Sequence, residues 1–108
     1  MRLILLPMLL LLPVFAQQQY KNLKVLTPDD MRAGAMRKIA GAMGKGCDFC
    51  HVQGDFSSDD KPEKATARKM MEMVHQINAN NFPDGKEHVT CYTCHRGSTE
   101  PLTAPPAN

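Results

Sequence analysis

Two five-residue strings carry the chemistry of this sequence: Cys47-Asp48-Phe49-Cys50-His51 and Cys91-Tyr92-Thr93-Cys94-His95. Positions i, i+3 and i+4 of a helical turn share one face, so both thiols of a string can reach the two vinyl groups on one edge of a haem. The His that follows then points its imidazole at the iron. Cys-x-x-Cys-His is the attachment signature of c-type haem. We therefore expect two haem c groups, with thioethers from Cys47, Cys50, Cys91 and Cys94 and with His51 and His95 as iron ligands.

The same cysteines are compatible with other chemistry. Two Cys-x-x-Cys pairs can form a Cys₄ zinc site, although 40 residues separate Cys50 from Cys91 and both following His residues would then be coincidental. Two local disulfides, or a thioredoxin-like redox motif, are further alternatives. A thioredoxin-like motif requires a βαβ setting, which this sequence does not predict. The haem interpretation accounts for the most residues.

The sixth iron ligand decides what kind of haem protein this is. Met36 lies eleven residues before Cys47 and Met70 lies twenty-one residues before Cys91. Both occupy predicted helices that could place a thioether over a haem. A Met on an apolar helix face more often fills the core. The spacing alone does not exclude the other candidates, which are Met31, Met43, Met71, Met73, His75 and His88.

Two helices are predicted, each leading into one of the cysteine strings. The first begins after Thr27, a suitable N-cap, with Pro28 at the first helical position. It runs to about Met43, where Gly44 and Gly46 end it.

The second predicted helix begins at Asp60, with Glu63 three residues later in a capping-box arrangement, and ends at about Ala79. Pro83 and Gly85 prevent its continuation. No segment reads as a strand. The sequence therefore predicts an all-α fold, a small multihaem c-type cytochrome made of two helix–turn–Cys-x-x-Cys-His units packed around two haems.

Length and composition limit the alternatives further. The chain has 108 residues, a net charge of +2, 6% aromatic residues and no Trp. This length corresponds to one domain, and the scarcity of large side chains predicts a thin core that needs a cofactor to stabilise it. The small net charge argues against a nucleic-acid partner. A large enzyme with a deep pocket of its own is excluded.

Four segments are expected along the chain. Residues 1–16 combine a positive start, a short apolar run and a small residue at the end, which is typical of a secretory signal peptide. Residues 17–26 form an N-terminal arm, residues 27–97 the dihaem domain, and residues 98–108 a Pro-rich flexible tail. The expected location is the periplasm, with membrane association if residues 3–15 are retained.

The stretch from Asn22 to Gly97 resembles the cytochrome c subunit of photosynthetic reaction centres. The resemblance is carried by Asn22-Leu23-Lys24-Val25-Leu26, Ser58-Asp59-Asp60-Lys61, Ala67-Arg68-Lys69-Met70, Ile77-Asn78 and the string from Val89 to Gly97. It implies that Met36 is the distal ligand of the first haem and Met70 that of the second. It also implies a membrane complex among the redox partners. Members from photosynthetic bacteria have four haems, so that this chain resembles the first half of one, and Gln17 stands where they commonly carry a lipid-modified Cys.

The expected function is electron transfer through two His/Met-ligated haems, because filled axial positions leave no site for a substrate. Redox proteins are then the donor and acceptor, and no small-molecule substrate is expected. The alternative is a small dihaem redox enzyme, similar to a peroxidase, with one open haem and His88 or Glu87 as the acid–base residue.

Overall fold

The computed structural model describes residues 20–108, which are helical and contain no strand. The helices are α1 (Pro28–Arg32), α2 (Ala35–Met43), a 3₁₀ turn η1 (Cys47–Phe49), α3 (Pro62–Asn81) and α4 (Cys91–His95). One isolated bridge pairs Val52 with Asp55. The all-α prediction is confirmed for this part of the chain. The signal peptide expected at residues 1–16 lies outside the described residues.

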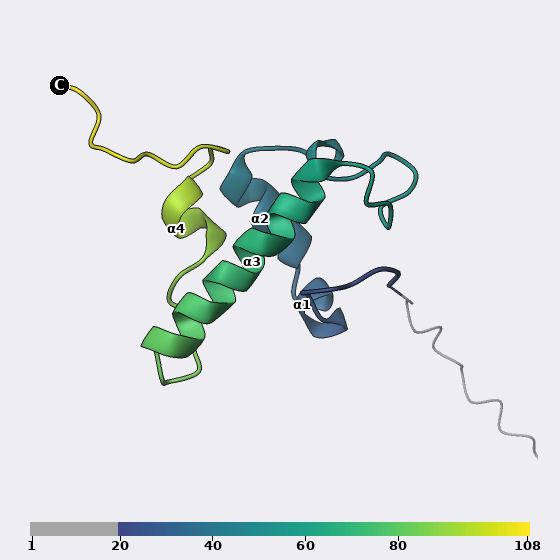
Figure 1. Cartoon of the computed structure of the whole chain (residues 1–108), viewed down its shortest axis with the longest axis horizontal. Coiled ribbons are helices and arrows are strands. Elements are labelled where there is room, and N and C mark those ends of the chain that lie inside the picture. Colours follow the sequence, from purple (N-terminus) through teal and green to yellow (C-terminus); the bar gives the residue numbers. More distant parts are fainter. Residues whose placement is uncertain (1–19) are drawn as a thin grey trace, which may run out of the picture.

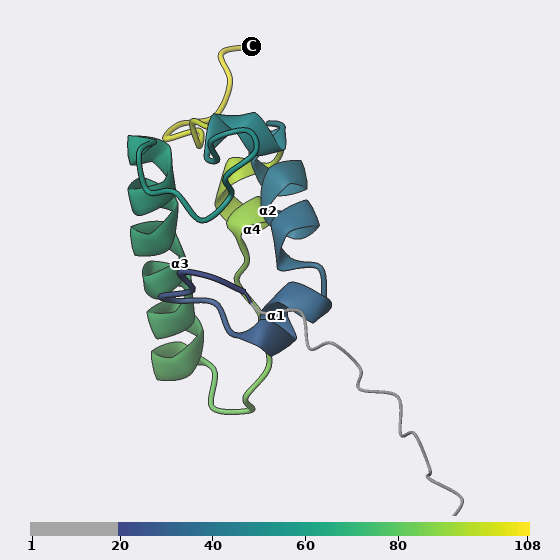
Figure 2. The same cartoon turned by 90° about the vertical axis from the view of Figure 1, so that its right-hand side faces the viewer.

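Helix α3 lies on one side of the molecule, and α1 and α2 lie on the other (Figure 2). The short helix α4 contacts both α2 and α3. In Figure 1, α3 crosses the molecule diagonally, and the tail after α4 extends away from it. None of the helices in residues 20–108 has the length and apolar character needed to cross a bilayer.

The start of the first predicted helix is confirmed, but its continuity was wrong. Thr27 is the N-cap of α1, where its side chain accepts a 3.2 Å hydrogen bond from the Asp30 backbone N–H and the Asp30 carboxylate accepts a 2.7 Å bond from the Thr27 N–H. The helix then stops at Arg32, because Gly34 adopts the left-handed conformation with φ +82°. A new helix begins at Ala35, and Gly44 ends it at φ +63°, as predicted.

The second predicted helix exists, but its cap and its ends differ from the prediction. α3 begins at Pro62 after Lys61, which makes no side-chain cap bond, so Asp60 is not the N-cap. The helix continues two residues beyond Ala79 to Asn81. Proline at the first helical position supplies the preset φ that starts the helix without a capping side chain.

The N-terminal arm is fixed against the start of α3 by a polar cluster. The Asp59 carboxylate accepts hydrogen bonds from Asn22, Lys24 and Arg68 and lies 3.3 Å from Lys64. The hydrogen bonds from Asn22 and Lys24, followed by those from Arg68 and Lys64, hold the pKa of Asp59 well below its usual range. This cluster connects residues 22–24 to α3 across more than thirty positions of sequence.

The core formed by side chains is thin in the described part of the chain. Ala42 is the one buried hydrophobic residue there, at 3% exposure, and Lys64 is the one buried charged residue. A small domain with so little burial does not reach ordinary stability by the hydrophobic effect alone.

Candidate haem site

The first cysteine string forms a tight turn directly after α2. Its first three residues make up η1, and the His51 backbone N–H donates a 3.0 Å hydrogen bond to the Cys47 carbonyl. This bond joins positions i and i+4, so both Cys residues and His51 lie on one helical turn, as the spacing predicted. Cys47 is exposed and Cys50 is partly buried.

The second string is the whole of α4, from Cys91 to His95. Thr90 and Thr93 cap the start of this helix, and the Thr93 hydroxyl accepts a 2.9 Å bond from the Thr90 N–H. Arg96 adopts a left-handed conformation with φ +53° and ends it. A five-residue helix is too short to be stable alone, so its caps and its contacts with α2 and α3 hold it.

The two His side chains are oriented in the same way. The Nδ1 atom of His51 lies 2.8 Å from the Phe56 carbonyl oxygen, and Nδ1 of His95 lies 2.8 Å from the Ser98 carbonyl oxygen. A carbonyl oxygen only accepts hydrogen bonds, so each Nδ1 carries the proton. The neutral imidazole then has its lone pair on Nε2, which is the arrangement that protein-bound metals use. Both His residues are thus prepared to ligate a metal through Nε2.

Cys50 and Cys91 do not have the environment of reactive thiolates. All four are unpaired. Burial, with Glu63 nearby, raises the pKa of the Cys50 thiol, and burial raises that of Cys91, whereas reactive cysteines have a lowered pKa. Within residues 20–108, no three Cys, His, Asp or Glu side chains converge on one point that could hold a metal ion. The raised thiol pKa values therefore disfavour a thioredoxin-like role for Cys50 and Cys91.

A main cavity of about 800 Å³ lies between α2 and α3. Its walls include Ile39, Ala42, Met71, Val74, His75 and Cys91. Pockets for cofactors typically measure about 300–1,000 Å³ and are mostly apolar. The cavity thus has the size and lining for a large apolar cofactor, and a thiol of the second string stands at its wall.

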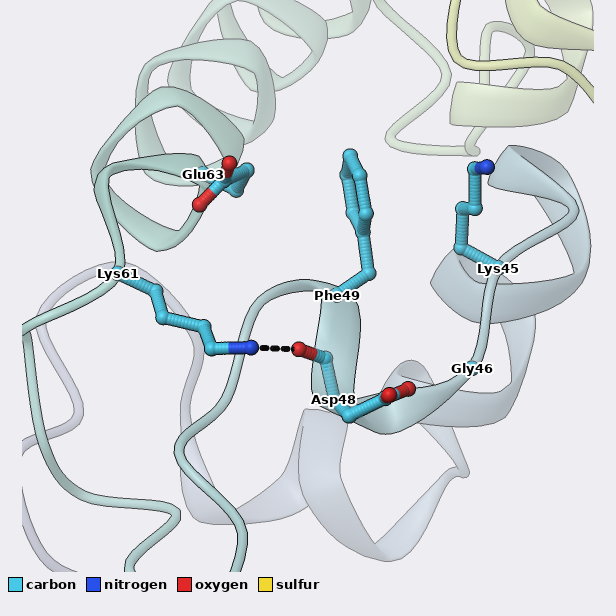
Figure 3. A pocket seen from close by; sticks show the side chains of 6 residues that line it. All are labelled: Lys45, Gly46, Asp48, Phe49, Lys61 and Glu63. Carbon is cyan, nitrogen blue, oxygen red and sulfur yellow. Dashed lines mark hydrogen bonds between the residues drawn. The ribbon is translucent and has the colours of Figure 1, made fainter.

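A smaller cavity of about 410 Å³ lies beside the first string (Figure 3). The Phe49 ring points into the space between Glu63 of α3 and Lys45, which lies two residues beyond the end of α2 (Figure 3). The Lys45 ammonium lies 5.5 Å from the ring centre. Lys61 donates a hydrogen bond to the Asp48 carbonyl. Lys45 thus contacts an aromatic side chain of the first string, and Lys61 contacts the backbone of Asp48.

The structure places the candidate sixth ligands on the expected helices. Met36 is half-buried on α2, and Met70 on α3 is 39% exposed. Neither of them lines the main cavity, whereas Met71 and His75 do. Met73 is 45% exposed on α3, and Met31 and Met43 are half-buried. The choice among them stays a prediction.

His88 has a different environment from the other candidates. Its Nε2 lies 2.8 Å from an Asp84 carboxylate oxygen, and its ring stacks on Phe82 with centroids 4.4 Å apart. The hydrogen bond from the Lys86 backbone N–H, followed by that from the His88 side chain, holds the pKa of Asp84 below its usual range. His88 is therefore engaged in the loop that connects α3 to α4.

Two positioning residues were missed by the sequence reasoning. The Asn78 side chain accepts hydrogen bonds from the backbone N–H groups of His88 and Val89 and donates to the Val89 carbonyl at 2.7 Å, so it fixes the approach to α4. Lys64 donates to the Phe56 carbonyl, to which His51 also binds. A polar side chain within a predicted helix gives no signal for either role.

The sequence of this chain is similar to known proteins over most of its length. Residues 13–104 match the family described as "Photosynthetic reaction centre cytochrome C subunit". The chain is 37% identical, over 82% of its length, to the photosynthetic reaction center cytochrome c subunit of Thermochromatium tepidum, and 35% identical, over 86%, to that of Rubrivivax gelatinosus. It is 38% identical, over 59%, to cytochrome c-554 of Chloroflexus aurantiacus.

The matched region is a limited part of each relative. It covers 23% of the protein from T. tepidum, 28% of that from R. gelatinosus and 16% of that from C. aurantiacus. The chain thus spans little more than a quarter of the length of these curated relatives, at most.

Proposed function

We propose, from the fact that the chain belongs to the photosynthetic reaction centre cytochrome c subunit family, that it is an electron carrier with two covalently attached haems. One haem is held by thioethers to Cys47 and Cys50 and the other by thioethers to Cys91 and Cys94. His51 and His95 bind the irons. Such a group supplies a one-electron couple between Fe(III) and Fe(II), and the chain supplies its attachment, orientation and surroundings.

One observation carries this proposal: the Nδ1 atoms of both His residues are fixed at 2.8 Å from a backbone carbonyl oxygen. Each Nε2 is therefore the free nitrogen, at the end of a turn that also presents two unpaired thiols. The same constellation appears twice, on η1 and on α4, which supports a count of two haems.

Met36 and Met70 are the sixth ligands in this proposal. Their thioethers would bind the irons together with His51 and His95, and a thioether ligand raises the reduction potential of a haem. An iron with both axial positions filled has no site for a substrate, which favours electron transfer over catalysis. His88, one of the two candidate acid–base residues of a peroxidase-like enzyme, is engaged with Asp84 and Phe82.

The partners in this proposal are redox proteins, and the relatives' names indicate a reaction centre as one of them. Residues 1–16 would direct the chain to the periplasm, where haem c is attached. Residues 98–108 contain no helix or strand and are almost wholly exposed, in agreement with a C-terminal tail outside the haem domain.

The test is expression with the haem-attachment machinery in the periplasm, followed by intact mass and a pyridine haemochrome assay. We expect two covalent haems per chain and a polypeptide that begins at Gln17. A mass equal to that of the bare polypeptide would end the cytochrome interpretation.

Methionine ligation is tested with Met70→Ala against Met73→Ala, a matched pair because both side chains are exposed on α3. Met70→Ala should remove half of the long-wavelength charge-transfer absorption that marks methionine-ligated ferric haem, and Met73→Ala should leave it. Loss in Met73→Ala alone, or in neither variant, would assign the ligand to another residue, with Met71 and His75 the next to test.

A further inference from the structure

The carbonyl group that orients His51 also accepts a hydrogen bond from a buried cation. The Phe56 carbonyl oxygen lies 2.8 Å from Nδ1 of His51 and 3.0 Å from the Lys64 ammonium. Lys64 is only 9% exposed and also donates to the Ser58 carbonyl at 2.7 Å. A charge is rarely buried to this extent unless its surroundings hold it, and here two backbone carbonyls do so.

The second motif lacks this cation. Nδ1 of His95 lies 2.8 Å from the Ser98 carbonyl oxygen, and within residues 20–108 no Lys or Arg side chain donates to that carbonyl. The two His residues therefore share the Cys-x-x-Cys-His pattern and the same Nδ1–oxygen distance, but the carbonyl groups that they bind have different further partners. The difference is the Lys64 ammonium.

The carboxylate nearest to Lys64 does not cancel its charge. Asp59 lies 3.3 Å from the ammonium but also forms ion pairs with Lys24 at 3.1 Å and with Arg68 at 2.9 Å. One negative charge is thus shared among three positive ones. Within this group of ion pairs, positive charge is in excess.

This arrangement changes how strongly His51 donates electrons to a metal. A carbonyl acceptor makes the imidazole a better ligand for the oxidised metal, because the N–H···O bond increases its basicity. An ammonium on the same oxygen draws electron density away from it, so that oxygen becomes a weaker acceptor for His51. The positive charge also directly favours the iron state of lower charge. Both effects raise the reduction potential.

We propose that Lys64 is a positioning residue that makes the haem bound by His51 the higher-potential haem of the two. The transferred electron then resides at equilibrium on the iron of the first motif, Fe(III) becoming Fe(II) there, and it comes from the Fe(II) of the second motif, which becomes Fe(III). This inference rests on the proposed function, since it requires both haems to be attached. It adds a direction of electron transfer between the two haems, which the shared Cys-x-x-Cys-His pattern does not provide.

The test is a potentiometric titration of the dihaem protein with dithionite as reductant, comparing Lys64→Met with the unchanged chain. Outer-shell partners of a metal typically change its affinity 10- to 100-fold. We expect a tenfold fall in the reduction constant of the higher-potential haem, which corresponds to about 59 mV for one electron. The lower-potential haem should change much less.

Lys61→Met is the matched control, because Lys61 is also a cation beside the first motif but donates to the Asp48 carbonyl instead. It should shift the potential by much less than Lys64→Met. Lys64→Arg, which retains the cation, should restore most of the original value. The proton NMR signal of His51 Nδ1–H in the reduced protein should move downfield in Lys64→Met, because its hydrogen bond strengthens.

Failure of this inference and failure of the proposed function give different results. A chain without two covalent haems refutes the function. A dihaem chain whose two potentials are unchanged in Lys64→Met, or change equally in Lys61→Met, refutes the role of Lys64. If Lys64→Met does not accumulate, Lys64→Gln replaces it with the same expected direction and the same overturning result.

Discussion

The two Cys-x-x-Cys-His units meet where the turn after α2 touches the turn after α4, and the contact depends on Gly44. The Gly97 backbone N–H donates a 2.8 Å hydrogen bond to the Ala42 carbonyl. A Cβ added at Gly44 would lie 2.1 Å from the Gly97 carbonyl oxygen, and Gly44 also has φ +63°. A Gly44→Ala substitution should therefore force the two turns apart.

The cost can be assembled from these observations. The left-handed backbone conformation costs a non-glycine residue about 1–2 kcal/mol. Relieving a close contact by moving backbone costs about 1–3 kcal/mol, and weakening the bond from Gly97 costs up to about 1.5 kcal/mol. We expect Gly44→Ala to lower the free energy of unfolding by about 2–6 kcal/mol in total.

Gly85→Ala is the matched control, because Gly85 has φ +70° and no atom within 4 Å of an added Cβ. It should cost only the conformational part, about 1–2 kcal/mol. Urea unfolding of the holoprotein, followed by far-ultraviolet circular dichroism and by haem absorption, measures both variants. Equal losses in the two variants would refute the reasoning that the contact with Gly97 holds the units together.

Three further changes have definite expected outcomes. Because the folded state lowers the pKa of Asp59, this carboxylate stabilises the fold above its usual pKa of 3.8, and the contribution is lost as the pH falls through the lowered value. Asp59→Asn should therefore flatten the dependence of the urea midpoint on pH in the acidic range. An unchanged slope would contradict this. Asn78→Ala should lower the free energy of unfolding by about 2–3 kcal/mol. It should also speed hydrogen exchange at the Val89 amide, which donates to the Asn78 side chain at 2.9 Å. Retained protection of that amide would contradict the prediction. Thr27→Ala removes the hydroxyl that accepts a hydrogen bond from the Asp30 N–H. It should lower the free energy of unfolding by about 1 kcal/mol, which thermal unfolding measures. An unaltered melting temperature would show that the cap is dispensable.

The parts of the fold that were predicted correctly depend on nearby residues. Thr27 caps α1 through a residue three positions away, and Gly44 ends α2 through its own backbone conformation. The break at Gly34 was not predicted, because a glycine inside a helical pattern costs only about 1 kcal/mol and is often tolerated. Here the break directs α1 so that Asp30 and Ala33 border the main cavity.

The same distinction applies to the start of α3. Asp60 and Glu63 have the spacing of a capping box, yet the N-cap is the next residue, Lys61, and the helix begins at Pro62. The neighbouring Asp59 is engaged by Asn22, Lys24 and Arg68, so the chain before Pro62 follows this cluster. A capping pattern cannot compete with contacts that span more than thirty residues, because those contacts exist only in the folded chain.

The sequence by itself determined the chemistry of the site. The order of Cys, Cys and His within five residues fixes which side chains share a helical turn, because helical geometry relates positions i, i+3 and i+4 wherever the turn lies. What the tertiary structure decided is how the two turns differ. Lys64 is buried beside the carbonyl that holds His51 because α3 packs against the loop after η1. No such cation donates to the carbonyl that holds His95 in residues 20–108. Two motifs of equal spacing therefore acquire unequal surroundings, since a local pattern sets which atoms can bind a metal and only the distant chain sets the charge around them.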